Sequence, residues 1–480
     1  MRIVFAASEL SPLASTGSLG DALEGLPAAL AARGHAVSIC LPCYRGLRDD
    51  PALRLQPTGV ELQIPIGARH VTAEILAGTA PNGVQLFLIR HDEYFDRPTL
   101  YGADGRADDD NAERFIFFSK AVVQLARRIN PPADIIHAHD WQTALIPVLI
   151  KEQRLPFRSV LTVHHLAYQG SFWAADFSLL NLPGEYFMAK GVEFYGQVNL
   201  LKGGLLFADR ITTVSQRYAQ EIQTPEGGAG LDAVVREHAH RLHGIPNGVN
   251  ARVWNPATDR VLPERFSADS LDGKRVCRAA LLAECHLAPR PAGPVIAMVT
   301  RLAAQQGIDL LVPLLDRLLA QDVRLIVLGE GNTKFERELA IASRRHPERF
   351  AYRRGSDLPL AHRISAGADL FLIPSHSEPG GQSAMHALKY GAVPIARAVG
   401  GLSETLHDDD PTSGHGNAIL FHHDSPAAFW DAIGRALGLF ADPARWAGLV
   451  QRAMASDCSW DQTAARYEAV YQLALRARRP

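Results

Sequence analysis

The sequence predicts an α/β protein with two parallel-sheet domains that face each other across a cleft. Short apolar runs of strand length alternate with segments of helical spacing in both halves of the chain, which is the pattern of repeated βα units. At 480 residues the chain is too long for one ordinary core. Polar, proline-bearing composition between Asn255 and Asp272 marks the boundary, so we place a linker near 245–260 and expect domains at 1–245 and 246–458.

The composition is typical of a soluble globular enzyme, with 47% hydrophobic and 21% charged residues. The net charge of −2 argues against nucleic acid or an anionic membrane as the main partner. No apolar stretch has the roughly 18 residues of a membrane span, and the apolar run at the N-terminus is too short for a signal peptide. Five cysteines form an odd, sparse set that is consistent with a reducing compartment, so we expect a cytoplasmic protein.

Cys40 and Cys43 have the C-x-x-C spacing of a redox pair. Such a pair belongs at the N-terminus of a helix, where its thiolate is stabilised. Here the two residues enclose Pro42 and follow the strand-like segment Ala36–Leu41, which favours a structural role.

The first half opens with a strand, a loop of small residues and a helix. The strand is expected at Ile3–Ala7, the loop at Ser8–Gly20, and Asp21 is the expected N-cap of a helix that Pro27 kinks. The loop lacks G-x-G-x-x-G, which disfavours a dinucleotide fold of the dehydrogenase kind. From Pro42 to about Arg106, short alternating runs predict hairpins inserted on the sheet.

Two runs of three aspartates raise the question of a metal site. Asp108–Asp110 precedes a helix predicted at 111–128, and Asp408–Asp410 lies in a predicted loop. A solvated acidic turn, favoured in the first case by the helix dipole, is the interpretation that we prefer for both runs.

Polar side chains end two neighbouring strands of the first half. Asp134–Asp140 predicts a buried strand with His137 and His139 on one face, because side chains alternate along a strand. A zinc pair is conceivable, but no third ligand follows at metal-site spacing, which argues against it. The next strand, Ser159–Val163, ends at His164. We place a ligand site at this carboxyl edge of the sheet, where α/β proteins bind their ligands.

The second half repeats the alternation of strands and helices. A short strand at 211–214 closes the first half, and further strands are expected at 295–299, 323–328, 370–373 and 393–396. Helices are expected from residue 308 through Ala320 and near 359–366. A last helix opens at Ser459–Trp460, and we expect the segment 459–480 to cross back to the first domain.

The stretch Ser375–Gly391, S-H-S-E-P-G-G-Q-S-A-M-H-A-L-K-Y-G, follows a predicted buried strand. Pro374 ends that strand, and Gly380 with Gly381 supplies a turn without side chains before a helix. The first backbone N–H groups of this helix are predicted to be unpaired at the positive end of its dipole, where they suit a phosphate. Glu378 lies two residues ahead of them. The alternative is a plain βα turn, because glycine pairs are common there.

Eight motifs in the expected order give the chain a specific resemblance over almost its whole length. They are E-L-S-P-L-A-S-T-G-S-L-G-D, Y-F-D-R-P-T-L-Y-G, D-N-A-E-R-F-I-F-F-S-K, H-A-H-D-W-Q, T-V-H-H-L-A-Y-Q-G, I-P-N-G-V-N, V-T-R-L-A-A-Q-Q-G-I-D-L and S-E-P-G-G-Q-S-A-M-H-A-L-K-Y-G. The chain resembles the bacterial glycogen synthases and plant starch synthases. The resemblance implies a GT-B fold and transfer of glucose from ADP-glucose to the non-reducing end of an α-1,4-glucan with retention. It implies no metal and no cofactor other than the donor substrate.

The resemblance also implies roles for individual residues. Glu378 matches the carboxylate that holds the donor sugar, Arg301 the arginine at the diphosphate, His164 the histidine beside the anomeric carbon, and Asp140 a carboxylate of the cleft. Further donor-binding positions are Ser15, Gly17, Asn247, Gln306, Gly355, Gly380, Gly381 and Gln382. The acceptor-binding positions are Glu9, Tyr101 and Tyr168.

The chain departs from the family's pattern inside the expected site. The family has lysine in K-T-G-G-L where this chain has Ser15, with Ser18 in place of the glycine, and lysine in R-L-x-x-Q-K-G where this chain has Gln306. C-G-L-T becomes G-G-Q-S at 380–383, and R-R-T-G-G becomes R-A-V-G-G at 397–401. Loss of one preorganised donor of this kind costs about 10²- to 10³-fold in rate, so we expect activity to be reduced. Arg353 and Arg354 are candidates to restore the charge.

Three functions therefore remain open from the sequence. The preferred one is a glycogen or starch synthase-type glucosyltransferase. The second is an impaired homologue that binds glucan or nucleotide and regulates a partner, which the missing lysines favour. The third is a transferase with another donor or acceptor. Incorporation of glucose from ADP-glucose into glycogen distinguishes them, and the sequence leaves the oligomeric state open.

Overall fold

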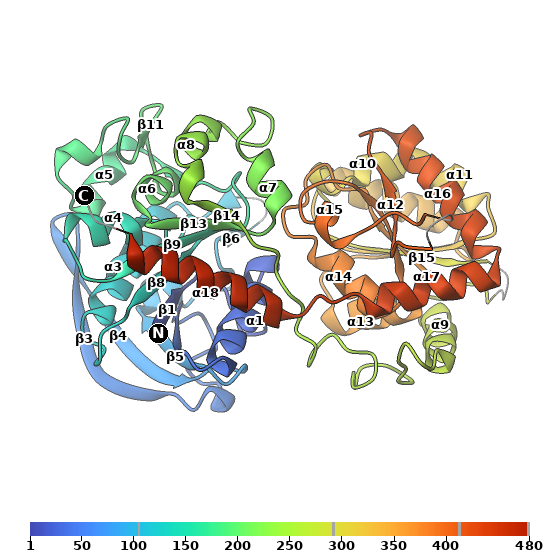
Figure 1. Ribbon diagram of the computed structural model, residues 1–480, viewed down its shortest axis with the longest axis horizontal. Coiled ribbons are helices and arrows are strands. Elements are labelled where there is room, and N and C mark those ends of the chain that lie inside the picture. Colours follow the sequence, from blue (N-terminus) through green and yellow to red (C-terminus); the bar gives the residue numbers. More distant parts are fainter. Residues whose placement is uncertain (104–105, 290–292, 411–413, 478–480) are drawn as a thin grey trace. The chain divides into compact units, whose positions relative to one another are not determined.

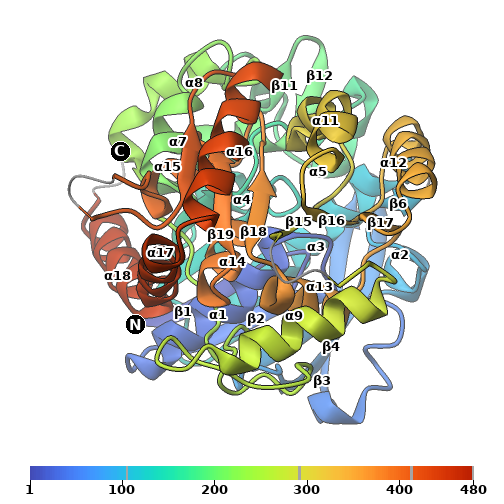
Figure 2. The same cartoon turned by 90° about the vertical axis from the view of Figure 1, so that its right-hand side faces the viewer.

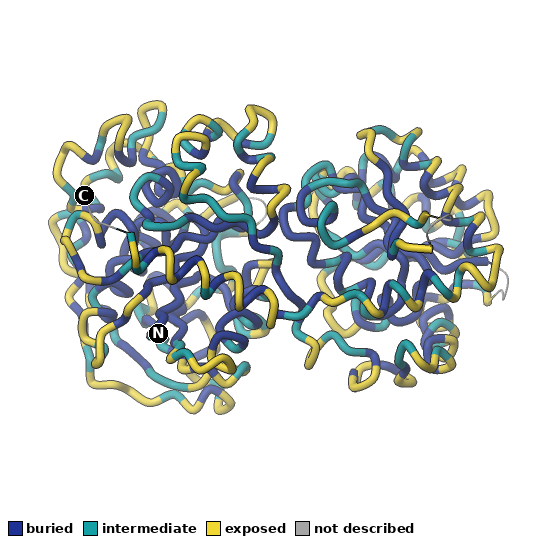
Figure 3. The backbone as a smooth tube through the Cα atoms, in the orientation of Figure 1, coloured by how far each residue is buried: buried dark blue, intermediate teal, exposed yellow. Residues whose placement is uncertain are grey.

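The computed structural model describes residues 1–103, 106–289, 293–410 and 414–477. The chain divides into two compact units, the first made of Met1–Gly248 with Trp460–Pro480 and the second of Val249–Ser459 (Figure 1). Each unit has its own sheet, and the central strands of both sheets are largely buried (Figure 3). Within the described ranges, no helix combines the length and the apolar character that crossing a membrane requires.

The first unit is built on a nine-stranded sheet. Its order is β14 (Leu242–Gly244), β13 (Arg210–Thr213), β9 (Arg158–Val163), β8 (Ile135–His139), β1 (Arg2–Ala6), β2 (Ala36–Pro42), β5 (Gln85–Arg90), β4 (Arg69–Thr79) and β3 (Gln56–Ile66). The seven strands from β14 to β5 are parallel, and β4 is antiparallel to both its neighbours. The predicted hairpins after Pro42 therefore extend the main sheet, because the sequence shows alternation but not which edge a hairpin joins.

The strand order of the first unit has a reversal between β1 and β8. From β1 the chain adds β2 and β5 on one side, and it then returns to add β8, β9 and β13 on the other. Loops that leave the carboxyl ends of the two central strands run in opposite directions, which opens a crevice where α/β proteins bind ligands. Glu9 follows β1 and Asp140 follows β8, so both lie at this point.

Helices of the first unit pack in two groups. The α1 helix (Ser18–Ala32) lies against α18 (Trp460–Arg476), whereas α3 (Asn111–Ala126), α4 (Leu145–Glu152) and α6 (Leu200–Phe207) form a second group. Shorter elements are α2 (Asp92–Phe95), α5 (Phe177–Leu180), α7 (Gln216–Glu221), α8 (Asp232–Glu237), β6 (Gly102–Ala103), β7 (Arg106–Ala107) and a small sheet of β10 (Ser171–Phe172), β12 (Gln197–Asn199) and β11 (Glu193–Phe194).

The start of α1 corrects one expectation. The helix begins at Ser18 after Gly17, so Asp21 is not its N-cap but lies in its first turn and accepts a hydrogen bond of 2.8 Å from Ser11 Oγ. The helix continues without a break through Pro27. It starts early because Leu19 is buried, and burial of an apolar side chain outweighs the cap preference that sequence spacing suggests.

The last helix, α18, docks on the first unit through specific contacts. Its Tyr471 hydroxyl lies 2.9 Å from His137 Nδ1, and Thr463 Oγ1 donates to Pro246 O at 2.8 Å. A Cβ added at Gly25 would lie only 1.9 Å from Trp460 Nε1. The first helix therefore needs a glycine where the last helix begins.

The second unit is a six-stranded parallel sheet covered on both faces. Its order is β17 (Phe350–Arg353), β16 (Arg324–Leu328), β15 (Val295–Val299), β18 (Leu370–Ile373), β19 (Val393–Arg397) and β20 (Ile419–Phe421), with the reversal between β15 and β18. Neighbouring residues of one strand, such as Ala297 and Met298, belong to different apolar clusters. This alternation is why the strands read as continuous apolar runs.

Figure 2 looks onto the second unit and shows helices on both sides of its sheet. The helices α9 (Asp272–Glu284), α13 (Leu358–Gly367) and α14 (Gln382–Lys389) lie on one side, and α11 (Leu315–Leu319), α12 (Thr333–Arg345) and α16 (Pro426–Phe440) supply the cluster of the other. The remaining helices are α10 (Ile308–Leu311), α15 (Leu402–Thr405) and α17 (Pro443–Ala455). The helix expected through Ala320 is divided into α10, a 3₁₀ turn at Val312–Leu314 and α11, because Pro313 interrupts the hydrogen-bond ladder.

Candidate active site

At the reversal of the first sheet, Glu9 ties two loops together. Its carboxylate accepts hydrogen bonds from the backbone N–H of Thr16 at 2.7 Å, from Thr16 Oγ1 at 2.8 Å and from the Tyr101 hydroxyl at 2.8 Å. Glu9 is 4% exposed. Burial first, and then the charge of Glu9, raise the pKa of Tyr101 well above its ordinary value, so this hydroxyl stays protonated and donates.

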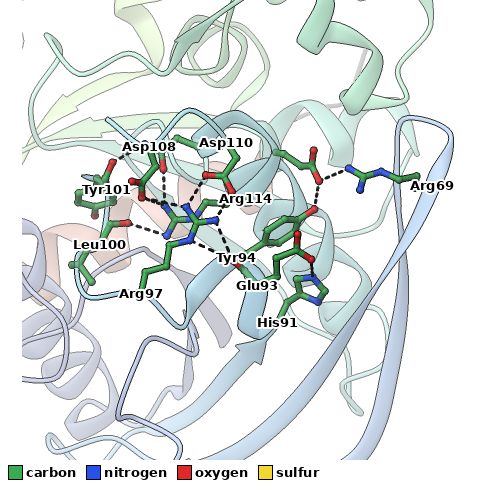
Figure 4. Close-up of polar contacts among 12 residues, drawn as sticks. Arg69, His91, Glu93, Tyr94, Arg97, Leu100, Tyr101, Asp108, Asp110 and Arg114 are labelled. Carbon is green, nitrogen blue, oxygen red and sulfur yellow. Dashed lines mark hydrogen bonds and ion pairs between the residues drawn. The ribbon is translucent and has the colours of Figure 1, made fainter. Parts of the chain in front are cut away.

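A buried arginine network holds the segment that carries Tyr101 (Figure 4). Arg114 is fully buried and donates to Asp108 Oδ2 at 3.0 Å and to Leu100 O at 3.1 Å. Arg97 forms ion pairs with Asp110 and Asp108. The run Asp108–Asp110 was expected to be a solvated turn. The turn is present ahead of α3, but Asp108 and Asp110 are only partly exposed, because arginines 6 to 13 residues away in the chain pair with them.

Asp140 adopts a strained backbone conformation at the end of β8. Its φ of 55° lies in the left-handed region, which only a few per cent of residues other than glycine adopt. The carboxylate accepts the backbone N–H of His164 at 2.7 Å. Burial raises the pKa of Asp140 to about 7, and the nearby charge of Glu9 adds to the shift. Backbone strain and a shifted pKa occur here at the same residue, a combination that is common at functional sites.

His164 belongs to a row of three buried histidines. Its Nε2 lies 3.0 Å from His139 Nδ1, and the neighbouring His137 contacts Thr162 Oγ1 at 2.6 Å. Burial lowers the pKa of His164 to about 3, so the ring is neutral near pH 7. His137 and His139 share a face, as predicted, with ring centroids 4.2 Å apart. Over the described ranges, no group of three or more His, Cys, Asp or Glu side chains is placed to hold a metal ion.

The other predicted residues of the first unit differ in their exposure. Ser15 and Gly17 are exposed in the loop before α1, where Ser15 Oγ donates to Gly17 O at 3.1 Å. Tyr168 is 54% exposed, and its ring lies 5.1 Å from that of His165. Asn247 is buried, and its Nδ2 has no hydrogen-bond acceptor among the described atoms. An amide donor left in this state is costly without a ligand.

In the second unit, Glu378 follows β18 at the reversal of the sheet. Its Oε1 accepts the backbone N–H of Gly381 at 3.3 Å, and its Oε2 accepts from Ser375 Oγ at 3.4 Å. The N–H groups at the start of α14 were expected to be unpaired. That is wrong for Gly381, because the Glu378 side chain folds back as a cap. Burial raises the pKa of Glu378, although these hydrogen bonds oppose the shift.

Gly381 of this turn and Gly401, which packs against it, are both required by the backbone. Gly381 has a φ of 66°, a conformation that side chains disfavour. A Cβ on Gly401 would lie 2.6 Å from the carbonyl carbon of Gly380. Gln382, the first residue of α14, is buried. The helix ends at Lys389, and Gly391 follows with a φ of 64°, the left-handed conformation that commonly terminates a helix.

The loop after β15 faces the same reversal. Gln306 Oε1 accepts a hydrogen bond of 3.0 Å from Thr300 Oγ1, which leaves its NH₂ group as the part that can donate to an anion. A small hollow is lined there by Met298, Val299, Thr300, Gln306, Leu372, Ile373, Ser375 and Ser383. Arg301 is exposed, and Gly355, after β17, has a φ of 115°.

Arg353 and Arg354 do not supply the missing charge in this structure. Arg353 donates to Glu284 O at 2.8 Å, and Arg354 forms an ion pair of 3.0 Å with Glu336. The hypothesis that these arginines replace the two lysines is therefore not supported. Sequence proximity to Gly355 indicated the loop but not the direction of either side chain.

Comparison with known proteins agrees with this geometry. The starch synthase catalytic domain family matches residues 2–237, and the glycosyl transferases group 1 family matches residues 287–447. Glycogen synthase from Anaeromyxobacter dehalogenans is 46% identical over 479 residues, covering 98% of this chain and 99% of that protein. Glycogen synthase from Opitutus terrae is 42% identical over 478 residues, with the same coverage.

The chain belongs to the glycogen and starch synthase family, and it is a glycosyltransferase. Among solved structures, the catalytic domain of starch synthase IV from Arabidopsis thaliana, bound to ADP and acarbose, matches with a TM-score of 0.92 and 32% identity, covering 99% of both chains. Sucrose-phosphate synthase from Thermosynechococcus elongatus matches with a TM-score of 0.61 and 19% identity, which shows a shared fold. The predicted α/β fold and the family are thus confirmed, and glycogen or starch synthase is the function that the relatives support.

The sequence did not reveal the residues that hold the predicted site residues in place. His139 contacts His164, Thr16 donates twice to Glu9, and Arg114 holds the Tyr101 segment. Thr16 and Arg114 both lie within motifs that carry the family resemblance, so their positions alone could have marked them as candidates. What the sequence lacked was the contact that gives each residue its role.

Proposed function

We propose that this glycosyltransferase uses ADP-glucose to extend α-1,4-glucan chains at their non-reducing ends with retention. In this reaction the bond between the anomeric carbon and the diphosphate oxygen breaks. A new bond forms from the 4-hydroxyl of the acceptor to the same carbon, and the hydroxyl proton passes to the departing phosphate. Positive charge develops on the sugar and negative charge on the diphosphate, so the catalyst needs carboxylate or carbonyl groups at one and donors at the other.

The second unit supplies the groups that suit the donor. Arg301, the NH₂ group of Gln306 and the start of α14 offer donors to a diphosphate, and Glu378 offers a carboxylate to the sugar. We assign the Gly381–Glu378 hydrogen bond to the ligand-free state: a phosphate at the helix start would take over the N–H and release the carboxylate toward sugar hydroxyls. The observation that carries the donor assignment is the Glu378 carboxylate at the backbone N–H of Gly381, where α14 begins.

The first unit supplies the groups that we assign to the acceptor and the transferred sugar. Glu9 and Tyr101 form a partly buried hydrogen-bonded pair, and the Asp140 carboxylate accepts the backbone N–H of His164. His164 is neutral near pH 7 because burial lowers its pKa to about 3, so it contributes dipoles rather than charge beside a cationic transition state.

The test is transfer of labelled glucose from ADP-glucose to glycogen, compared with UDP-glucose as donor. We expect incorporation that Glu378→Ala reduces by about 10²-fold or more, with new α-1,4 linkages in the product. Glu348→Ala, which removes an exposed acidic side chain of the same unit just ahead of β17, at the amino ends of the strands, is the control and should retain activity. No incorporation above the Glu378→Ala level from either donor would reject the proposal, and transfer from UDP-glucose alone would correct the donor.

A further inference from the structure

His376 stands two residues before Glu378, and carboxylates face both of its ring nitrogens. Nδ1 lies 2.7 Å from Asp424 Oδ1, and Nε2 lies 3.0 Å from Asp309 Oδ1. Arg397 also reaches Asp424, with Nη1 3.0 Å from Oδ2. These are the charged groups that face the ring among the described residues.

This arrangement requires a charged ring. A neutral imidazole can donate from one nitrogen only, so one of the two carboxylates would then face a lone pair. The imidazolium donates from both nitrogens and satisfies Asp309 and Asp424 together. Burial lowers the pKa of His376, but the hydrogen bonds to Asp424 and Asp309 outweigh burial and raise it above its ordinary value.

The same residue fastens the loop of Glu378 to its neighbours. Its backbone N–H donates to Gln305 O at 2.8 Å, in the loop after β15. Arg397, at the end of β19, donates to His376 O at 2.9 Å. Asp309 lies in α10 and Asp424 lies between β20 and α16, so the ring bridges the segments that follow β15 and β20.

We propose that His376 is a positioning residue, whose protonated ring clamps the loop of Glu378 between Asp309 and Asp424, and that loss of its proton loosens the loop and slows glucose transfer. The kinetic part rests on the proposed function. The structural part, the clamp itself, does not.

The direction of the pH dependence follows from the raised pKa. Below the ordinary histidine pKa of about 6.5 the ring is protonated in the folded and the unfolded chain, and the clamp is fully formed. As the pH rises through the higher pKa of the folded state, the proton and one hydrogen bond are lost. Activity and order of the loop should therefore fall on the alkaline side.

The test compares His376→Arg, which keeps the charge at all pH values, with His376→Gln, which has no charge. The control is His423→Gln, an exposed histidine next to Asp424. The readouts are kcat/KM for ADP-glucose with glycogen and hydrogen exchange of the backbone amides of residues 375–381, both at about pH 6.5 and about pH 9.

We expect the wild type to lose about three- to tenfold in kcat/KM between the two pH values relative to His376→Arg, because the ion pairs are partly exposed and each is modest. The kcat/KM of His376→Gln should be low at both pH values, and that of His423→Gln should change with pH as it does in the wild type. Exchange of 375–381 should be faster in the wild type than in His376→Arg at the higher pH only. Two results would overturn the inference. One is equal hydrogen exchange in the wild type and His376→Gln at both pH values. The other is a fall in kcat/KM between the two pH values that is as large in His376→Arg as in the wild type. If the wild type transfers no glucose at all, the proposed function fails while the exchange data still decide the clamp.

Discussion

Replacement of Arg114 by methionine should destabilise the first unit strongly. The substitution keeps most of the side-chain volume but removes the donors for Asp108, Leu100 O and Asn111 Oδ1. Breaking a buried ion pair by deleting one partner costs about 3–5 kcal/mol. Arg97 remains 3.4 Å from Asp108, whose side chain is 27% exposed, so the remaining charge is not isolated. We therefore expect the lower end of the range, about 3 kcal/mol.

A loss of this size is measurable by thermal unfolding. In a unit of this size each kcal/mol moves Tm by about 2–4 °C, so the first-unit transition should fall by about 6–12 °C. Scanning calorimetry resolves transitions of separate units better than a single spectroscopic signal. The control is Arg45→Met, whose ion pair with Asp96 is more than half exposed on both sides (57% and 55%) and should contribute less than about 1 kcal/mol.

The same variant tests the role assigned to Tyr101. Because Asn111 Nδ2 donates to Tyr101 O at 2.8 Å and Arg114 orients Asn111, loss of the arginine should raise the KM for glucan more than the KM for the nucleotide sugar. A Tm within about 2 °C of the wild type, or a loss no larger than that of Arg45→Met, would refute the reasoning about burial.

Three further outcomes are expected. Gln306→Lys should raise kcat/KM for ADP-glucose by about tenfold, less than a full lysine effect because glutamine already donates, and steady-state kinetics showing no gain would contradict its place at the diphosphate. Asp140→Asn should remove one contribution to the pH dependence of stability. Burial raises the pKa of Asp140 to about 7, so between the ordinary carboxyl pKa of about 4 and about 7 the folded wild type binds a proton that the unfolded chain releases, and its free energy of unfolding falls as the pH rises. Urea unfolding at several pH values should show this slope for the wild type and not for the variant. Gly25→Ala should lower the free energy of unfolding by about 1–3 kcal/mol, because the added Cβ would lie 1.9 Å from Trp460 Nε1. Gly434→Ala is the control: it lies in a helix with no atom within 4 Å of the added Cβ, and it should raise the free energy of unfolding by up to about 1 kcal/mol. Equal Tm values for the two variants would be inconsistent with this packing.

Most of the secondary structure followed from the sequence, because buried parallel strands are short apolar runs with glycine or proline at their ends. The strand expected at 295–299 is observed at Val295–Val299, and the strand expected at 370–373 at Leu370–Ile373. Errors arose where packing outweighed local preference, as at the start of α1 and at Pro313 within the interrupted helix.

The site followed the same division. The motifs placed Glu378, His164 and Asp140 at the carboxyl ends of strands. In the structure, Asp140 and Glu378 follow strands at a reversal of strand order, and His164 follows β9, the strand next to one. The functional roles of these residues remain predictions. The partners of the charged side chains were not accessible from spacing, as the arginines at 353 and 354 show.

By itself the sequence determined the chemical types at the loops and the alternation of strands and helices, because both depend on residues close together in the chain. Only the tertiary structure decided which distant groups meet: His376 with Asp309 and Asp424, Glu9 with Tyr101, and His137 with Tyr471. The physical reason is that the energy of an ion pair or a hydrogen bond depends on distance and burial, and both are set by how the sheet brings remote segments together.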